Sequence, residues 1–153
     1  MPTPLARALV SGTVTSLATS AALALMSRAA GRPAVAPINA TSHWVHGDKA
    51  ARAPETDVSR TLVGFATHHA ASFLWAYVFE RLAGLRGRPG APVLFRNAAA
   101  VAAVAAVVDY GIVPKRLTPG WELVLPKRSV ATTYAVLALG LAVGGWLSER
   151  RDR

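Results

Sequence analysis

The chain has 153 residues, of which 52% are hydrophobic and 16% are charged. In an average soluble domain roughly a quarter of the residues are charged. The lower charged fraction here argues against a soluble domain and indicates an integral membrane protein. The formal net charge of +9 does not predict nucleic-acid binding, because the Lys and Arg residues lie in every loop and both tails, beside apolar stretches, where they contact lipid headgroups.

Four apolar stretches follow one another along the chain, and each is about as long as the ~20 residues that cross the ~30 Å hydrocarbon core of a bilayer. They predict transmembrane helices near residues 5–30, 61–83, 92–113 and 129–148. A chain of this length is expected to form one domain, residues 1–153. The predicted fold is therefore all-α, a four-helix transmembrane bundle with a long polar loop between its first and second helices.

The first stretch, "PLARALVSGTVTSLATSAALALMSRAAG", has a second interpretation as a signal peptide, because "AVA" at 34–36 resembles a cleavage site. Pro37 directly after that site, and the length and Ser/Thr content of the stretch, favour a membrane helix. A soluble, alanine-rich bundle is the other alternative. It would need a polar face every three or four residues, which the fourth stretch lacks between Tyr134 and Trp146.

Small residues recur at four-residue spacing on the predicted helices. Helices in lipid associate by close packing, so such stripes mark the contacts between them. The last helix carries a GxxxG pair, Gly140 and Gly144, which serves either contacts within the chain or a dimer. The residues expected at helix contacts are Gly12, Ser16, Ser20, Gly64, Ala102, Gly140 and Gly144.

The second helix contains two adjacent histidines, His68 and His69, within "TLVGFATHHAASFLWAYVFERL". Gly64, His68 and Ser72 are spaced by four residues and share one helix face, so we expect His68 to point into the bundle. His69 lies about 100° around the helix and is expected in an aromatic or lipid-facing environment. These histidines and Asp109 in the third helix are the conspicuous polar groups inside the predicted spans.

His68 and Asp109 are expected at similar depths. In a chain of hairpin-connected spans, the start of the second helix and the end of the third lie on the same side of the membrane. At ~1.5 Å per residue, His68 lies about 10 Å and Asp109 about 6 Å from those helix ends. A carboxylate at the bilayer centre costs at least ~2.5 kcal/mol, so Asp109 needs a partner or a wet cavity. We therefore predict that His68 and Asp109 share a polar pocket beneath the first and third loops.

The two loops on that side contribute further polar residues. The first loop reads "INATSHWVHGDKAAR", and the third reads "VPKRLTPGWELVLPKR", which also holds Glu122, Lys127 and Arg128. If 41–51 forms a short helix, Trp44 suits a membrane-interface anchor. The residues we expect at a polar or ligand site are His68, Asp109, His43, His46, Asp48, Lys115 and Arg116.

No catalytic motif supports an enzyme, because the sequence has no cysteine, no GxSxG, no HExxH and no phosphate-binding glycine loop. We therefore predict that the protein is not an enzyme, and we predict no cofactor. Metal and haem binding stay open as alternatives. The candidate metal ligands are His43, His46 and His68, although their spacing matches no metal-site signature. A bis-histidine haem site would need histidines on facing helices, and the other predicted spans contain none.

Two segments, "PINATSHWVHGDKAA" and "HHAASFLWAYVFE", resemble small multi-span bacterial inner-membrane proteins of unknown role, over residues 37–80. The resemblance implies a bacterial membrane protein and carries no catalytic residue across. The expected location is therefore the inner membrane. Both termini are placed in the cytoplasm, because the second loop and the tail are short and densely basic.

The leading hypothesis is a membrane protein with a structural or accessory role. Its expected partners are membrane lipids and either further copies of the chain, as a homo-oligomer, or a larger membrane complex. The first alternative is a small transporter or proton-coupled carrier that uses Asp109 and His68. The second alternative is a metal- or haem-binding redox component.

Overall fold

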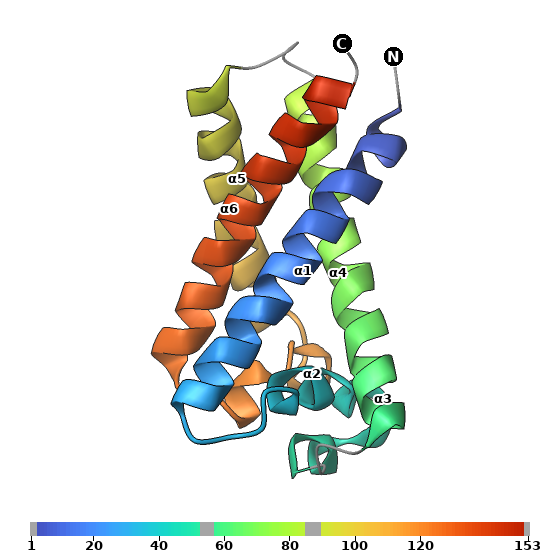
Figure 1. The fold of residues 1–153 in the computed structure, drawn as a ribbon, viewed down its shortest axis with the longest axis vertical. Coiled ribbons are helices and arrows are strands. Elements are labelled where there is room, and N and C mark those ends of the chain that lie inside the picture. Colours follow the sequence, from blue (N-terminus) through green and yellow to red (C-terminus); the bar gives the residue numbers. More distant parts are fainter. Residues whose placement is uncertain (1–2, 53–56, 85–89, 152–153) are drawn as a thin grey trace. The chain divides into compact units, whose positions relative to one another are not determined.

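The computed structural model describes residues 3–52, 57–84 and 90–151. Within these ranges the chain is helical and contains no strand, which confirms the all-α expectation. The long helices drawn in Figure 1 are α1 (Pro4–Ala29), α4 (Val58–Gly84), α5 (Ala91–Val107) and α6 (Lys127–Arg151).

The connection between α1 and α4, expected as a long polar loop, is partly helical. It contains α2 (Ala36–Thr41), α3 (His43–His46) and the 3-10 turn η1 (Asp48–Arg52). Pro37 lies in the first turn of α2, where its fixed φ favours the start of a helix. Every residue of α2 is buried, so this segment packs as part of the fold.

A π-helical turn and two 3-10 turns connect α5 to α6. They are η2 (Val108–Ile112), η3 (Lys115–Leu117) and η4 (Trp121–Leu123). Asp109, expected in a regular helix, lies in the π-helical turn. Pro114 follows shortly after η2 and has no N–H with which to continue a helix. The connection is therefore a series of tight turns.

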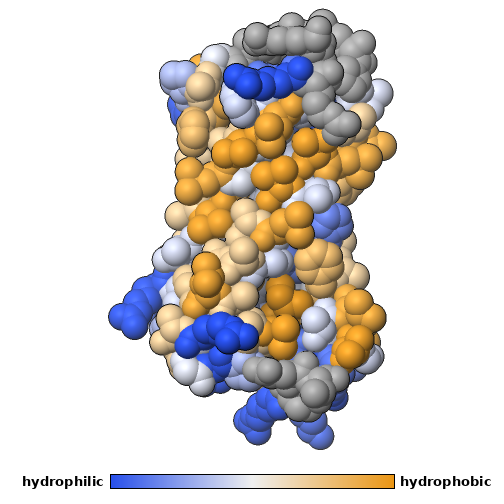
Figure 2. Space-filling view, in the orientation of Figure 1, coloured by the Kyte–Doolittle hydropathy of each residue, from blue (hydrophilic) through white to orange (hydrophobic). Residues whose placement is uncertain are grey.

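Among the described residues, three helical segments are long and apolar enough to cross a membrane: Pro4–Ala29, Ala91–Ile112 and Lys127–Arg150. Figure 2 shows apolar side chains over much of the face that carries α1 and α6. α4 is also long, with 27 residues, but polar side chains such as His68 and His69 lower its hydropathy. A fourth span at α4 therefore stays a prediction.

The chain divides into two compact units, and each contains part of every long helix. Unit 1 comprises Met1–Thr19, His69–Ala105 and Tyr134–Arg153, and unit 2 comprises Ser20–His68 and Ala106–Thr133. Unit 2 therefore contains the ends of α1 and α5, the starts of α4 and α6, and both connections described above.

In unit 1, α1 and α6 approach closely at two glycines of α6. A Cβ atom at Gly140 would lie 2.8 Å from the Cα atom of Thr15, and a Cβ atom at Gly144 would overlap the backbone of Ser11. The hydroxyls of Ser11 and Thr15 donate to main-chain carbonyls four residues earlier, at 3.2 and 2.7 Å. These hydroxyls are therefore satisfied within α1, and the two helix backbones are free to pack closely.

Other small residues expected at helix contacts are buried to different degrees. A Cβ atom at Gly12 would lie 3.0 Å from the Cα atom of Phe73, so α1 and α4 also meet closely in unit 1. Ser16 is fully buried, and Ala102 on α5 is 4% exposed. Ser20 is half-buried. A larger side chain at Gly12 would have to displace the α4 backbone.

In unit 2, α2 packs against the start of α4. Gly64 lies against the main-chain carbonyl of Ile38, and any Cβ atom there would overlap it. The hydroxyl of Thr61 donates to the side-chain oxygen of Asn39 at 2.6 Å. Asn39 is 1% exposed and Thr61 is half-buried, so this partly buried hydrogen bond joins α2 and α4.

His68 on α4 packs edge-on against Trp121 of η4, with ring centroids 5.8 Å apart and an angle of 66° between the ring planes. The two residues are 4% and 3% exposed. Edge-to-face ring pairs are favourable because the positive edge of one ring meets the negative face of the other. This contact positions the connection between α5 and α6, which we call the third connection, against α4 within unit 2.

Candidate functional site

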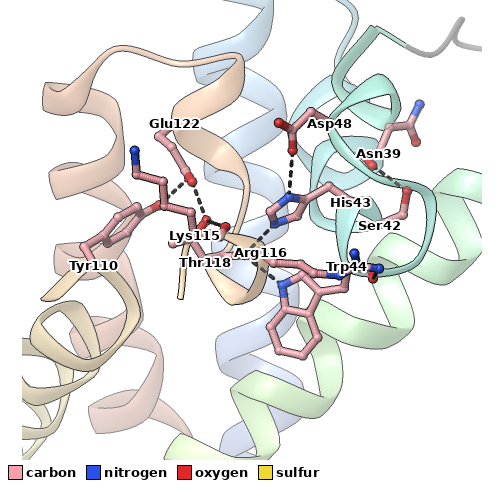
Figure 3. Close-up of polar contacts among 10 residues, drawn as sticks. All are labelled: Asn39, Ser42, His43, Trp44, Asp48, Tyr110, Lys115, Arg116, Thr118 and Glu122. Atoms are coloured by element: carbon pink, nitrogen blue, oxygen red, sulfur yellow. Dashed lines mark hydrogen bonds and ion pairs between the residues drawn. The ribbon is translucent and has the colours of Figure 1, made fainter. Parts of the chain in front are cut away.

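A polar pocket of about 680 Å³ opens in unit 2. Its side chains come from both connections, on α3, η1, η2, η3, η4 and the turns beside them (Figure 3). We call it the polar pocket, and it is lined by His43, Gly47, Asp48, Tyr110, Lys115, Arg116, Thr118, Glu122 and Leu123.

The main-chain carbonyl of Thr118 joins the two connections. The Nε2 atom of His43 lies 2.8 Å from this carbonyl oxygen, and the Nε1 atom of Trp44 lies 2.8 Å from the same oxygen. A carbonyl only accepts, so both ring nitrogens donate and His43 carries a proton on Nε2. His43 is 2% exposed. Two adjacent residues of α3 thus hold one carbonyl of the distant third connection.

Asp48 approaches the other nitrogen of the His43 ring. Its Oδ1 atom lies 3.4 Å from Nδ1, and the Asp48 side chain is 83% exposed. A neutral ring that donates from Nε2 presents a lone pair at Nδ1, whereas an imidazolium donates from both nitrogens. Each ring nitrogen of His43 therefore faces an oxygen atom, the Thr118 carbonyl at Nε2 and the Asp48 carboxylate at Nδ1.

Gly120 shapes the turn that presents the Thr118 carbonyl. Its φ of 82° lies in the left-handed region, which favours glycine. A Cβ atom at this position would lie 2.6 Å from the carbonyl oxygen of Ala40 and 3.1 Å from the His43 ring. The segment "TPG" therefore combines a turn with an approach to α2 and α3 that a side chain at Gly120 would prevent.

Glu122 is held by hydroxyl groups on both of its carboxylate oxygens. The phenol of Tyr110 donates to Oε2 at 2.9 Å, and the hydroxyl of Thr118 donates to Oε1. Tyr110 belongs to the π-helical turn η2, and such turns are frequent at functional sites. The π-helical turn thus places a side chain from the end of the apolar segment Ala91–Ile112 at the polar pocket.

Lys115 and Arg116 supply the positive charge of the pocket. Among the described residues, neither cation of η3 has a carboxylate partner, and the ion pairs His43 with Asp48 and Arg60 with Asp57 involve other side chains. Arg116 makes only a long hydrogen bond, from Nη2 to the carbonyl oxygen of Trp44 at 3.4 Å. The acids of the pocket are held by hydroxyls and an imidazole, and its cations are not neutralised.

The structure brings together part of the set expected from the sequence. Among those residues, the pocket is lined by His43, Asp48, Lys115 and Arg116. His46 does not line it, and its Nδ1 atom lies 3.3 Å from the hydroxyl oxygen of Ser42.

The remaining expected residues lie elsewhere. His68 is buried against Trp121, and Asp109 is half-buried in η2. Both belong to unit 2, whereas His69 is half-buried in unit 1. A shared site of His68 and Asp109 stays a prediction.

Sequence reasoning did not find Tyr110, Thr118 or Trp121. Thr118 contributes through its carbonyl, which no side-chain pattern reports, and Tyr110 depends on the π-helical turn. The available signal was the turn sequence Thr118-Pro119-Gly120, since Pro and Gly mark tight turns. It predicts a sharp bend but not the residues that the bend contacts.

A second polar group inside the helices also escaped sequence reasoning. Glu80 on α4 is 2% exposed and lies in unit 1. Near a helix end a glutamate is commonly assigned to the membrane surface, so its charge alone did not suggest burial. A Cβ atom at Gly145 would lie 3.6 Å from the Oε1 atom of Glu80, which places this carboxyl group beside α6.

Among the described residues, the three histidines considered as metal ligands do not gather with other His, Cys, Asp or Glu side chains. In the part of the chain that the structure describes, no three His, Cys, Asp or Glu side chains lie close enough together to hold a metal ion. The polar pocket instead offers hydrogen-bond donors and charges of both signs. Comparison of the chain with models of protein families, with curated proteins and with solved structures gave no match.

Proposed function

We propose that the protein is a small integral membrane protein that binds a small ligand with an anionic group in the polar pocket. One observation carries the proposal: Lys115 and Arg116 line this pocket, and no described carboxylate pairs with them. Ammonium and guanidinium groups donate charge-assisted hydrogen bonds to carboxylates and phosphates, and a guanidinium can do so through two parallel bonds. A ligand anion would supply the partner that the protein does not.

The two acids at the same pocket support a ligand that also carries donors. Asp48 and Glu122 each accept hydrogen bonds from the protein, but a carboxylate has about four lone-pair positions in total. Both side chains are exposed, so the remaining positions are open to a ligand. Hydroxyl or ammonium groups beside the anionic group therefore suit this pocket better than a simple inorganic anion.

The backbone around the pocket is held in place without the ligand. The Thr118 carbonyl accepts from His43 and Trp44, and the carboxylate of Glu122 accepts from Tyr110 and Thr118. A site that is already ordered loses less conformational freedom when a ligand binds. This order favours specific binding over a diffuse attraction of ions to a basic surface.

We place the pocket at a membrane surface, with α4 as a fourth span. Lys115 and Arg116 follow the apolar segment Ala91–Ile112 closely, and both connections of the pocket belong to unit 2. If the termini are in the cytoplasm of a bacterial cell, the pocket opens on the outer side of the inner membrane. Reporter fusions after residues 50 and 88 test this topology, and fusions that report the same compartment would contradict it.

A proton-coupled carrier is the second candidate function. The observation that favours it is the position of Asp109 in the π-helical turn that ends a segment apolar enough to cross a membrane. Such turns are frequent at functional sites, and an acidic residue within a membrane span commonly marks a proton or ion pathway. In this function Asp109 and His68 would handle the proton. Proton-driven uptake into liposomes that depends on Asp109 would establish it, and equal uptake by Asp109→Asn would exclude it.

Ligand binding is tested with the full chain in a neutral detergent by titration calorimetry. The probes are inorganic phosphate, glycerol phosphate and phosphoethanolamine, and vesicles with and without anionic lipid separate a soluble ligand from a lipid headgroup. The double variant Lys115→Gln/Arg116→Gln removes both cations. We expect at least ~10-fold weaker binding, since a charged hydrogen bond contributes ~1.5–3 kcal/mol.

The matched control is Lys127→Gln/Arg128→Gln. These two basic residues also lie in unit 2, next to each other in the sequence, but they do not line the pocket. The control should bind the probes as the unchanged protein does. Equal weakening in the two double variants would show a nonspecific effect of surface charge and would contradict the proposed site.

A further inference from the structure

A second cavity lies in unit 1, and its lining differs in composition from that of the polar pocket. It has a volume of about 260 Å³. We call it the apolar groove, and it is lined by Ala91, Leu94, Phe95, Ala142, Val143 and Trp146. Among the described residues this lining is apolar apart from the indole N–H of Trp146, so the groove suits a hydrocarbon occupant better than a polar ligand.

The two walls of the groove come from helices that are apolar enough to cross a membrane. Ala91, Leu94 and Phe95 belong to α5, and Ala142, Val143 and Trp146 belong to α6. Phe95 is 49% exposed and Trp146 is 41% exposed, so the groove opens on the surface of unit 1. In a membrane, the hydrocarbon that reaches such a surface is the acyl chain of a lipid.

A cation stands at one end of the groove. The guanidinium carbon of Arg150 lies 3.9 Å from the centre of the Trp146 ring, a cation–π contact. Arg150 is one helical turn after Trp146, near the end of α6. Tryptophan and arginine are typical of the membrane–water boundary, where the ring meets the acyl region and the cation meets headgroup phosphates.

We propose that the apolar groove binds one acyl chain of an anionic phospholipid, whose headgroup is bound by Arg150. The apolar lining accounts for the chain, and the positive charge at its end accounts for the headgroup. α5 begins and α6 ends in unit 1, so cytoplasmic termini would place this lipid in the cytoplasmic leaflet, where anionic lipids attract basic residues. The inference rests on the proposed membrane insertion but not on any ligand of the polar pocket.

Native mass spectrometry of the full chain tests the lipid site. The protein is transferred from detergent with equal amounts of phosphatidylglycerol and phosphatidylcholine, and bound lipids are counted. We expect the unchanged protein to retain more phosphatidylglycerol than phosphatidylcholine. Trp146→Ala should lose at least ~5-fold of both lipids, because it removes most of one wall. Arg150→Gln should keep lipid binding and lose the preference for phosphatidylglycerol.

Leu147→Ala is the matched control, since Leu147 neighbours Trp146, is 37% exposed and does not line the groove. Trp146→Leu keeps part of the apolar volume and tests the proposal if Trp146→Ala fails to fold. It should retain less lipid than Leu147→Ala, and it should lack the cation–π contact. Equal lipid retention by Trp146→Ala and Leu147→Ala would overturn the proposal. So would a lipid-free dimer that Trp146→Ala dissociates, because a second copy would then be the occupant.

The same measurement separates this proposal from the proposed function. Lys115→Gln/Arg116→Gln should retain phosphatidylglycerol normally while losing the small anionic probes. Arg150→Gln should bind those probes normally. Loss of the lipid preference in the Lys115/Arg116 variant would show that the lipid headgroup occupies the polar pocket and would overturn the assignment to the groove.

Discussion

His43 and Thr118 are 75 residues apart in the sequence, and the Nε2 atom of His43 lies 2.8 Å from the carbonyl oxygen of Thr118. The neighbouring Trp44 donates to the same oxygen at an equal distance of 2.8 Å. The polar pocket therefore depends on a junction between two connections that could otherwise move independently.

His43→Ala should destabilise the third connection more than Trp44→Phe does. The alanine variant leaves a cavity beside a buried main-chain carbonyl and removes one of its two donors, which should cost ~1–3 kcal/mol of stability. Trp44→Phe removes the other donor at a partly exposed position, which should cost ~0.5–1.5 kcal/mol. Hydrogen exchange of the amides of residues 117–124 measures both effects. Val45→Ala is the control, since Val45 is 66% exposed on the same helix. Exchange as slow in His43→Ala as in Val45→Ala would contradict the role of this hydrogen bond.

Gly120→Ala should be more damaging than Gly31→Ala. Both glycines have a positive φ, 82° and 70°, and Gly31 follows α1 in the left-handed pattern of helix C-termini, so an alanine at either position is strained by ~1–2 kcal/mol. At Gly31 the added Cβ atom meets nothing within 4 Å, whereas at Gly120 it would lie 2.6 Å from the Ala40 carbonyl oxygen. The difference in thermal stability between the two variants therefore isolates the close approach. Equal stability would show that the turn can move away from α2 without loss.

Gly144→Ala should lower the stability of unit 1, and Gly111→Ala should not lower it. A Cβ atom at Gly144 would overlap the backbone of Ser11, and overpacking of this kind costs ~1–3 kcal/mol. A Cβ atom at Gly111 finds its nearest neighbour at 3.9 Å, the Cγ1 atom of Val107. Leu141→Ile is a second control, because it conserves the volume of a fully buried side chain. Thermal unfolding in detergent compares the variants, and a Gly144→Ala protein as stable as the controls would rule out the α1–α6 contact.

Asp57 should give α4 a stability component that disappears in acid. The main-chain amide of Arg60 donates to the Asp57 carboxylate at 3.0 Å, and this hydrogen bond, with the Arg60 guanidinium, lowers the pKa of the carboxyl below its ordinary value of 3.8. A carboxyl whose pKa is lower in the folded state stabilises that state above its unfolded pKa, and the contribution is lost as the pH falls through the folded value.

Asp57→Asn provides the comparison, because an asparagine keeps an oxygen that caps the helix but does not titrate. We expect the unchanged protein to exchange the first-turn amides of α4 faster as the pH falls below 3.8, after correction for intrinsic exchange. The variant should lack this additional acceleration. Identical pH profiles of the two proteins would contradict the capping role of the carboxylate.

The long helices could be predicted from the sequence, whereas α2 could not. Three of the long helical segments, Pro4–Ala29, Ala91–Ile112 and Lys127–Arg150, are apolar over a length that matches a bilayer, and this signal needs no knowledge of neighbours. α2 has six residues, too few to show a helical period, and its burial depends on Gly64 in another helix. Its sequence reads as a polar connection because the residues that cover it lie elsewhere in the chain.

The candidate site was partly predictable for a related reason. His43, Asp48, Lys115 and Arg116 are polar residues on connections that a hairpin topology places on one side, so their proximity follows from the order of the helices. Tyr110 reaches the site because it lies in a π-helical turn. Such a turn changes the directions of the side chains, so the regular α-helical period does not predict where Tyr110 points. Side-chain patterns report which residues are available, and the irregular turns decide which of them meet.

The acceptor at the junction of the two connections is a main-chain atom, and this has a consequence for how the protein can change over time. A substitution at position 118 alters the hydroxyl that donates to Glu122 but leaves a carbonyl for the rings of His43 and Trp44. The side-chain donors can therefore be lost by substitution of the residues that carry them, whereas the main-chain acceptor cannot. A single substitution at His43 or Trp44 removes one of the two donors. The Thr118 carbonyl can be moved away only by a change in the shape of the turn, and Gly120 is the residue on which that shape depends.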